Sequence, residues 1–427
     1  MEAEAPHFFP MKLHCLRLLF AMVMIAPLSA TPSLPVVTPA AAGMSAERLG
    51  RVDEFIARLQ AEGKLAGAVT VVARRGQLVS LAAHGLADLG TRRVMRTDDI
   101  FQLQSMTKPV TTVAVLMLLE EGRFLLSDPV EKFLPEFHDM KVAVSRAGAP
   151  EGYELVSAAR AITIHDLLTH RAGFIGLPPT GSPAETLRRK AFKSLPADGN
   201  FTLEEYVKNL AASPLDAQPG AVYRYGPATI VLGRLVEVVS GRTLEQFFQE
   251  RIFAPLDMPD SFFSVPEAKR FRVVPAYTIA PDKQLVKLPP DPLTPRFFSG
   301  GGNLFSTATD YLHFCQMLLN GGEFAGHRLL GRKSVESMTT PVVEDLPIPF
   351  LRGQSFGLGV AVQKADGASG LLGSPGTYGW SGGYNTYFRI DPREKLILIF
   401  LAQQEFSPTN LELEYGFQNT VMQAITD

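Results

Sequence analysis

The stretch Ser105-Met106-Thr107-Lys108 leads directly into a long apolar segment, residues 110–119, which closes at Gly122. We predict one buried helix of about four turns here, because almost every side chain in the segment is apolar. Proline at position 109 is tolerated, since the first turn of a helix does not need its N–H. Gly122 is typical of a helix end. Residues three apart share a helix face, so we expect the Lys108 amine beside the Ser105 hydroxyl.

This pair indicates a possible nucleophile and its base. A serine hydroxyl becomes a good nucleophile only when a neighbouring group takes its proton, and Lys108 is placed to do so. A pattern with two fixed letters is weak evidence, because a chain of this length should contain about one match by chance. The rest of the sequence therefore has to supply partners for Ser105 and Lys108.

Composition excludes several classes of function. The chain has 427 residues, 46% hydrophobic and 20% charged, which is ordinary for a soluble globular protein. Its formal net charge is −2 and it has no basic block, so nucleic acid is not an expected partner. The eight histidines are scattered and there is no HExxH or CxxC, so we expect no metal site and no cofactor. For His165 and His170, the nearest pair, packing or hydrogen bonding is a better interpretation than ligation.

The N-terminal region resembles a secretory leader. Lys12 and Arg17 precede a nearly apolar run at 18–25, and Pro27-Leu28-Ser29-Ala30 resembles a processing site. Residues 11–30 are therefore a candidate signal peptide, too short to span a bilayer, so we expect no stable membrane insertion. If the leader is used, the protein is periplasmic or secreted, and otherwise cytoplasmic. Residues 31–43 read as a linker, and removal of the leader would leave Cys315 without a disulfide partner.

The remaining periodicity predicts an α+β fold. We expect helices after Ser45 and over 163–170, 202–212, 226–251 and 409–425, and β-rich runs over 68–73, 77–83, 357–363, 384–390 and 395–402. Residues 141–160 read as an exposed excursion and 176–200 as loop. This pattern predicts an antiparallel sheet flanked by helices, with an inserted, mainly helical lobe. We place the sheet part at about 44–125 and 300–425, and the lobe at about 126–299.

Two further stretches offer partners for Ser105. Tyr225 stands just before Gly226, where its hydroxyl could project into a cleft and act first as general base and then as general acid. Gly379-Trp380-Ser381-Gly382-Gly383 precedes a predicted strand, and a Gly-Gly start to an edge strand lets the backbone approach a ligand. Its N–H groups could hold an oxyanion together with the N–H of Ser105. Taken alone, each stretch is better explained as ordinary structure.

Together, and in this order, the three stretches resemble the motifs of the serine β-lactamase-like superfamily, which includes class C β-lactamases, DD-peptidases and family VIII carboxylesterases. The resemblance covers residues 44–425. It implies Ser105 as nucleophile, with Lys108 and Tyr225 as its proton-transfer partners. It also implies an oxyanion hole at the N–H groups of Ser105 and Gly383. Substrate binding would involve Trp380, Ser381 and Gly382.

Two departures from the family pattern point to esters. The second motif runs Tyr225-Gly226-Pro227 and lacks the family's asparagine, and the third has Trp380 where lactamases and peptidases carry a cation. An indole cannot pair with a carboxylate as a charge, but it offers a broad apolar wall. Family VIII carboxylesterases are similar at this position. We therefore predict a serine carboxylesterase acting on small, short-chain acyl esters, with weak β-lactam hydrolysis as a side activity.

Three alternatives remain open. The first is a class C-type β-lactamase or DD-peptidase, which the missing cation and asparagine disfavour. The second is an acyltransferase, which the sequence does not separate from an esterase. The third is a non-catalytic binding protein of the same fold.

A rival nucleophile is Ser381, because Gly379-Trp380-Ser381-Gly382-Gly383 also matches the Gly-x-Ser-x-Gly elbow of α/β-hydrolases. That elbow needs a helix after the serine, whereas residues 384–390 read as a strand. It also needs a histidine downstream, and none follows Ser381. We therefore reject the elbow interpretation.

Overall fold

The computed structural model describes residues 1–2, 34–196, 199–344, 346–348, 351, 353–365, 367–406 and 411–427. The predicted leader, 11–30, lies outside the described residues. Ser33–Asp427 forms a compact unit, to which the following description refers. No helix within the described part of the chain is long and apolar enough to cross a membrane.

An eight-stranded antiparallel sheet forms the centre of this unit, in the order β12-β13-β14-β15-β16-β1-β2-β3. The strands come from both ends of the sequence: β1 (Gly67–Arg74), β2 (Gln77–Asp88), β3 (Arg93–Val94), β12 (Gln354–Phe356), β13 (Ala361–Gln363), β14 (Tyr378–Gly382), β15 (Thr386–Asp391) and β16 (Leu396–Leu401). β1 pairs with β16, Val69 opposite Leu401, which joins the first hairpin to the C-terminal strands. The predicted antiparallel sheet is confirmed.

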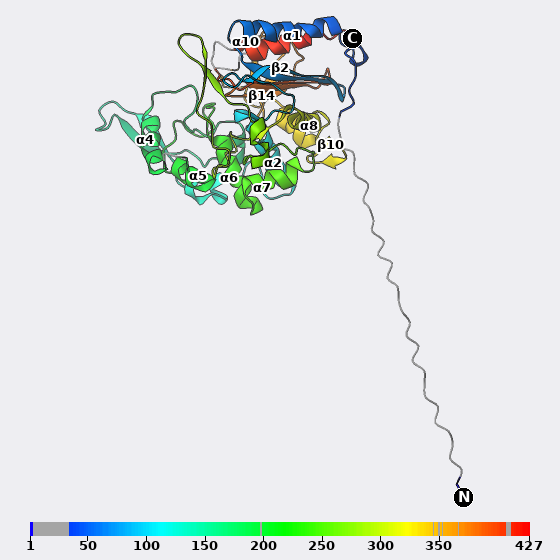
Figure 1. Cartoon of the computed structure of the whole chain (residues 1–427). Helices are drawn as coiled ribbons and strands as arrows, with labels where there is room; N and C mark the ends of the chain where they lie inside the picture. The colour runs from blue at the N-terminus through cyan, green and yellow to red at the C-terminus, as the bar shows by residue number, and fades with distance from the viewer. Residues whose placement is uncertain are drawn as a thin grey trace. The chain divides into compact units, whose positions relative to one another are not determined.

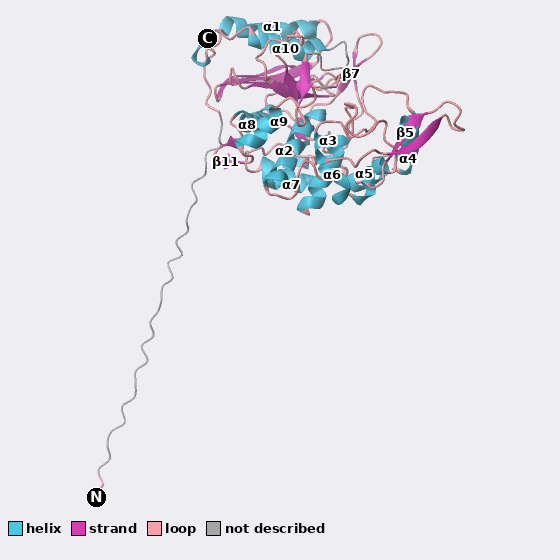
Figure 2. Cartoon of the chain, turned by 180° about the vertical axis from the view of Figure 1, so that it is seen from behind, coloured by secondary structure: helices cyan, strands magenta, loops and turns pink. Residues whose placement is uncertain are grey.

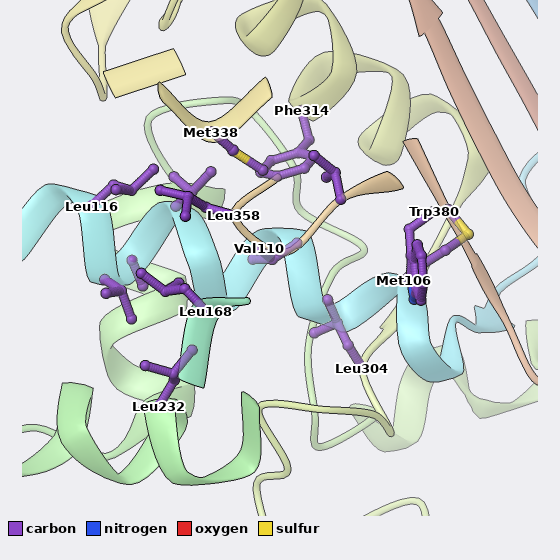
Figure 3. Packing of buried hydrophobic residues seen from close by; sticks show 14 of the residues in the cluster. Met106, Val110, Leu116, Leu168, Leu232, Leu304, Phe314, Met338, Leu358 and Trp380 are labelled. Carbon is purple, nitrogen blue, oxygen red and sulfur yellow. The ribbon is translucent and has the colours of Figure 1, made fainter. Parts of the chain in front are cut away.

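Helices cover both faces of the sheet (Figures 1 and 2). On one face lie α1 (Ala46–Ala61), capped by Ser45 as expected, and α10 (Leu411–Met422). On the other lie α2 (Thr107–Glu120), α8 (Ala308–Leu319) and α9 (Arg332–Thr339). Each face has its own hydrophobic cluster. Figure 3 shows Val110 and Leu116 of α2 among Phe314, Met338 and other side chains of the larger cluster. This burial explains why the 110–119 segment is almost wholly apolar.

The lobe between residues 126 and 299 is mainly helical. It contains α3 (Ile164–Leu168), α4 (Pro183–Ala191), α5 (Leu203–Ala211), α6 (Ala228–Ser240), α7 (Leu244–Phe248), and the hairpins β5 (Lys141–Ser145) with β6 (Tyr153–Ser157) and β7 (Tyr277–Ile279) with β8 (Leu285–Lys287). Helix α6 packs against α2. Two short pairs lie elsewhere: β4 (Phe101–Gln102) with β9 (Phe305–Ser306), and β10 (Glu323–Phe324) with β11 (His327–Arg328).

Short helical turns complete the chain. The 3-10 turns are η1 (Ala40–Ala42), η2 (Gln104–Met106), η3 (Val130–Lys132), η4 (Pro135–Phe137), η5 (Phe192–Ser194) and η7 (Glu267–Arg272), and η6 (Gln249–Phe253) is a π-helix. Among them η2 matters most, because it carries Ser105.

Two local predictions were wrong. Residues 176–200 are not all loop, because α4 begins at Pro183, where a proline in the first turn favours a helix. The single helix expected over 226–251 is divided at Gly241, whose φ of 71° ends α6. The exposed excursion predicted at 141–160 is present as a β-hairpin.

Candidate functional site

Ser105 lies in the 3-10 turn η2, directly before α2. Helix α2 therefore starts at Thr107, two residues later than the start at Ser105 that the Ser-x-x-Lys spacing suggested. Gln104 precedes the serine with a φ of 50°, an uncommon conformation for a residue with a side chain. The turn is held by Thr107 Oγ1, which donates to Gln104 O at 2.7 Å, and by Tyr311 Oη, which donates to Met106 O at 2.9 Å. These bonds fix the backbone on both sides of Ser105.

Lys108 is the partner that the spacing predicts. Its Nζ donates to Ser105 Oγ at 3.0 Å and to the carbonyl oxygen of Gly301 at 2.6 Å, and the residue is only 5% exposed. The Gly301 contact was not predicted. A Cβ at Gly301 would lie 3.0 Å from Ile230 Cγ1 and 3.5 Å from Lys108 Nζ, so a residue without a side chain suits this approach. The Gly300-Gly301-Gly302 run was the sequence signal for it.

Tyr225 lies beside Lys108, which contacts Ser105. Lys108 Nζ lies 4.7 Å from the centre of the Tyr225 ring, a cation–π distance. The Tyr225 Oη accepts a hydrogen bond from Trp380 Nε1 at 3.2 Å. The loop that carries Tyr225 is fixed by Leu177 N, which donates to Tyr225 O at 2.7 Å, and a Cβ at Gly176 would lie 2.4 Å from that oxygen. The structure thus brings Ser105, Lys108 and Tyr225 together.

His170 is a neighbour of Tyr225 that the sequence did not assign to the site. It follows α3 with a φ of 54°, and its ring centre lies 4.9 Å from that of Tyr225. Burial, assisted by the positive charge of Lys108, lowers the pKa of His170 to about 3. The imidazole is therefore neutral near pH 7. Of the two predicted roles, packing fits: neither ring nitrogen has a hydrogen-bond partner within the described part of the chain.

Trp380 packs against Tyr225 rather than standing alone as a pocket wall. The indole is 5% exposed, and its ring centre lies 5.2 Å from those of Tyr225 and Phe356. Trp380 lies on β14, which has β13 and β15 on either side. Only Tyr378 and Gly379 of β14 pair with β13, so the rest of the motif pairs with β15 alone. The strand that follows the motif, β15, lies between β14 and β16, so the expectation of an edge strand there was wrong.

Gly382 brings β14 close to the turn that carries Ser105. A Cβ at Gly382 would lie 2.2 Å from Leu103 O and 3.2 Å from Gln104 Cβ. Thr386 Oγ1 donates to the same Leu103 oxygen at 2.8 Å, which fastens β15 there as well. Gly383 follows at an exposed turn, and a Cβ added to it would meet nothing within 4 Å.

Ser381 lies away from this group. Neighbouring residues on a strand point to opposite faces, and the Ser381 side chain lies near the Glu414 carboxyl of α10, whose pKa it lowers, across the sheet from α2. The prediction that its side chain binds substrate is therefore not supported by its position. It is also no nucleophile elbow, because β14 turns directly into β15 instead of a helix.

A cavity of about 520 Å³ opens beside Lys108 and Tyr225. Apolar walls come from Ile175, Leu177, Ile230 and Phe297, and charged side chains from Arg188 and Asp291. Trp380 does not line this cavity, so its predicted contact with substrate stays a prediction. The cavity gives a small molecule access to Lys108, whose amine contacts Ser105.

No group of three or more His, Cys, Asp or Glu side chains that could hold a metal ion occurs in the described part of the chain. Cys315 is buried, and burial raises the pKa of its thiol well above the usual value.

Comparison with known proteins identifies the family. The Beta-lactamase family model matches residues 52–418. Protein Rv1367c of Mycobacterium tuberculosis (strain ATCC 25618 / H37Rv) is 36% identical over 355 residues, covering 80% of this chain and 86% of that protein. Esterase EstB of Burkholderia gladioli is 28% identical over 408 residues, covering 90% and 97%.

A solved structure shares the fold. EstCE1, described as a hydrolase with promiscuous acyltransferase activity, matches with a TM-score of 0.72 at 24% identity, over 90% of this chain and 98% of that one. The family match spans most of the sheet, the lobe between its two parts, and all three motifs. The chain therefore belongs to the Beta-lactamase family.

Proposed function

We propose that this serine hydrolase of the Beta-lactamase family is a carboxylesterase that hydrolyses small, short-chain acyl esters through an acyl-enzyme on Ser105. The observation that carries the proposal is the contact of Lys108 Nζ with Ser105 Oγ at 3.0 Å, with Tyr225 beside the same amine. The likeness to Esterase EstB, along nearly the whole of both chains, supports the ester as substrate.

The proposed reaction has two halves. Ser105 Oγ bonds to the ester carbonyl carbon while its proton passes to the Lys108–Tyr225 pair. The bond from the carbonyl carbon to the alcohol oxygen then breaks, and Tyr225 returns the proton to that oxygen. Water attacks the acyl-enzyme by the same proton path, which releases the acid and restores the Ser105 hydroxyl.

Hydrogen-bond donors must stabilise the negative charge that develops on the carbonyl oxygen. We assign this role to the backbone N–H groups of Ser105 and Gly383. The tight approach of Gly382 to Leu103 supports this assignment, because it draws the end of β14 toward the Ser105 turn.

The environment of Trp380 supports an ester over a β-lactam. Its indole donates to Tyr225 and offers no charge for the carboxylate of a β-lactam. A charge-assisted hydrogen bond contributes about 1.5–3 kcal/mol, which corresponds to about ten- to a hundredfold in transition-state binding. We therefore expect β-lactam turnover to be slow or absent.

The test compares two substrates on one preparation. We expect kcat/KM for p-nitrophenyl butyrate to exceed that for a chromogenic cephalosporin, and a series of p-nitrophenyl esters to show the highest activity with short acyl chains. A higher value for the cephalosporin would instead support a β-lactamase. Adding an acceptor alcohol separates hydrolysis from acyl transfer, because a transferase would yield the new ester.

We also propose that the protein is exported and that residues 11–30 are removed. The proposal rests on the basic residues Lys12 and Arg17 followed by the apolar run. N-terminal sequencing of the protein from its native host tests it. A cytoplasmic chain that retains residues 11–30 would contradict it.

A further inference from the structure

Arg188 supplies a positive charge to the cavity from a wall that none of the three motifs provides. It lies on α4, in the lobe, and is half-buried. It lines the same cavity as Lys108 and Tyr225. A second groove of about 380 Å³ shares Ile175, Gly176 and Arg188 with that cavity, so the guanidinium stands where the two spaces adjoin.

Neutral groups hold the Arg188 side chain. Its guanidinium carbon lies 5.3 Å from the centre of the Phe192 ring, and Nη1 donates to Ile175 O at 3.4 Å. The Tyr206 hydroxyl interacts with it electrostatically. These contacts restrict the guanidinium without neutralising its charge, which is the condition under which an arginine is prepared for an anionic ligand.

No carboxylate within the described part of the chain pairs with Arg188. The nearest acid on the same helix, Glu185, accepts instead from the backbone N–H of Thr180 at 2.6 Å. Asp291 also lines the cavity, and its carboxylate accepts from Tyr384 Oη at 3.0 Å. A half-buried guanidinium with only neutral partners gains more from an incoming anion than one that is already paired.

We infer that Arg188 is a specificity-determining residue that binds a carboxylate of the substrate, away from the ester that reacts. This inference rests on the proposed esterase activity and narrows it to esters that carry one remote carboxylate. Half-esters of dicarboxylic acids are the simplest members of this class. The apolar side chains Ile175, Leu177 and Phe297 would contact the carbon chain between the two ends.

A single carboxylate fits better than a phosphate. The fork of a guanidinium matches the two oxygens of a carboxylate. Lys108 is the other cation that lines the cavity, and it is occupied by Ser105 and Gly301. Asp291, which also lines the cavity, disfavours a doubly charged group.

The site also differs from the one that a β-lactam carboxylate would need. The cation that pairs with a β-lactam carboxylate would stand in the third motif, where this chain has Trp380 on β14. Arg188 instead comes from α4 in the lobe. A substrate can therefore be anionic here only if its carboxylate reaches the lobe side of the cavity.

The first experiment measures kcat/KM for monomethyl esters of dicarboxylic acids of increasing length, and for methyl esters of monocarboxylic acids matched in length. For the wild type, we expect kcat/KM for the half-ester to exceed kcat/KM for the neutral ester at some chain length, so that their ratio rises above one. Arg188→Gln should lower that ratio about ten- to a hundredfold, mainly through KM, which is the loss expected for one charge-assisted hydrogen bond. Arg188→Lys should recover part of it. Lys190→Gln, an exposed cation on the same helix, is the matched control and should leave the ratio unchanged.

The second experiment does not depend on turnover. Trp380 is the single tryptophan of the chain and contacts Tyr225, so its fluorescence reports ligand in the cavity. In the Ser105→Ala background, a half-ester should bind about tenfold or more weakly when Arg188→Gln is added. Equal affinity with and without Arg188, or a half-ester to neutral-ester ratio that Arg188→Gln does not lower, overturns the inference while leaving the esterase proposal intact. Absence of any ester hydrolysis, with half-ester binding still dependent on Arg188, would instead overturn the esterase proposal.

Discussion

Two serines in this chain stand in sequence patterns typical of nucleophiles, but one lies in a turn beside the central sheet and the other within a strand of it. Ser105 occupies a 3-10 turn at the start of α2, and Lys108 and Tyr225 connect it with a cavity. Ser381 lies one residue before the end of β14, near the buried carboxyl of Glu414. Both have a titratable neighbour, but only Ser105 has an amine partner beside a space for substrate.

Backbone geometry and access decide which serine can react. A turn before a helix exposes the hydroxyl and directs backbone N–H groups toward it. Ser381 instead lies in a strand, paired with Tyr387 of β15. Glu414 is moreover held largely protonated at neutral pH, because burial raises its pKa to about 8. A protonated carboxyl cannot take the proton of Ser381.

The largest effect should come from replacing the two serines in turn. Ser105→Ala should reduce kcat for p-nitrophenyl butyrate by about a thousandfold or more, because the covalent step is lost. Ser381→Ala should keep kcat within about tenfold and cost about 1 kcal/mol of stability, the typical effect of a single substitution. A larger loss of kcat from Ser381→Ala than from Ser105→Ala would reverse the comparison.

The next largest effect should come from the proton path on the Ser105 side. Lys108→Ala and Tyr225→Phe should each lower kcat by about a hundredfold or more, the range for removing a proton-transfer partner. The double variant should lose much less than the product of the two single losses, because both residues serve one path. Steady-state kinetics of the three variants checks this. Wild-type turnover in either single variant would mean that the base is assigned incorrectly.

A smaller effect should come from the contact between β14 and the Ser105 turn. Gly382→Ala places a Cβ 2.2 Å from Leu103 O, so the strand or the turn must move. We expect a loss of about 1–3 kcal/mol in unfolding free energy together with reduced kcat. Gly383→Ala is the matched control, since its Cβ meets open space and its N–H is kept. Denaturant unfolding and kinetics of both variants separate this contact from a general effect of losing glycine, and equal behaviour of the two would contradict it.

The smallest effect on catalysis should come from Glu414, on the Ser381 side. Its folded pKa of about 8 lies above the usual value because of burial, with Arg389 and Ser381 acting in the opposite direction. The folded state thus holds a proton that the unfolded state releases, so stability is full below about pH 4.3 and falls as pH rises toward 8. In the wild type, the unfolding free energy should fall by up to about 1.4 kcal/mol per pH unit in this range. Glu414→Gln should remove this fall, with little change in kcat.

Urea unfolding of wild type and Glu414→Gln at several pH values between 5 and 8 measures the difference. Because other groups titrate equally in both proteins, the difference between the two curves isolates Glu414. Parallel curves would show that this carboxyl is not held protonated.

Much of the fold could be predicted from the sequence because its signals are local. Ser45 caps α1 as predicted, and the apolar run of α2 reflects burial on all sides. Predictions failed where a local signal was overlooked or outweighed. Pro183 begins α4 inside the stretch 176–200, which we predicted to be loop. Gly241 divides the single helix predicted over 226–251.

The candidate site was predictable in its members but not in its contacts. The spacing of Ser105 and Lys108 placed their side chains together, whereas the Gly301 carbonyl that accepts from Lys108 is 193 residues away in sequence. The side of the sheet to which Ser381 points depends on the pairing of β14, which residue types alone do not specify. Arg188 gave no sequence signal, because its role depends on where α4 packs.

The central claim is that Ser105, and not Ser381, forms the covalent intermediate. Labelling the folded wild-type chain with a fluorophosphonate, followed by peptide mapping, tests it most directly, with Ser105→Ala and Ser381→Ala as paired controls. We predict one adduct, on Ser105, which persists in Ser381→Ala and disappears in Ser105→Ala. An adduct on Ser381, or labelling that survives Ser105→Ala, would contradict the account.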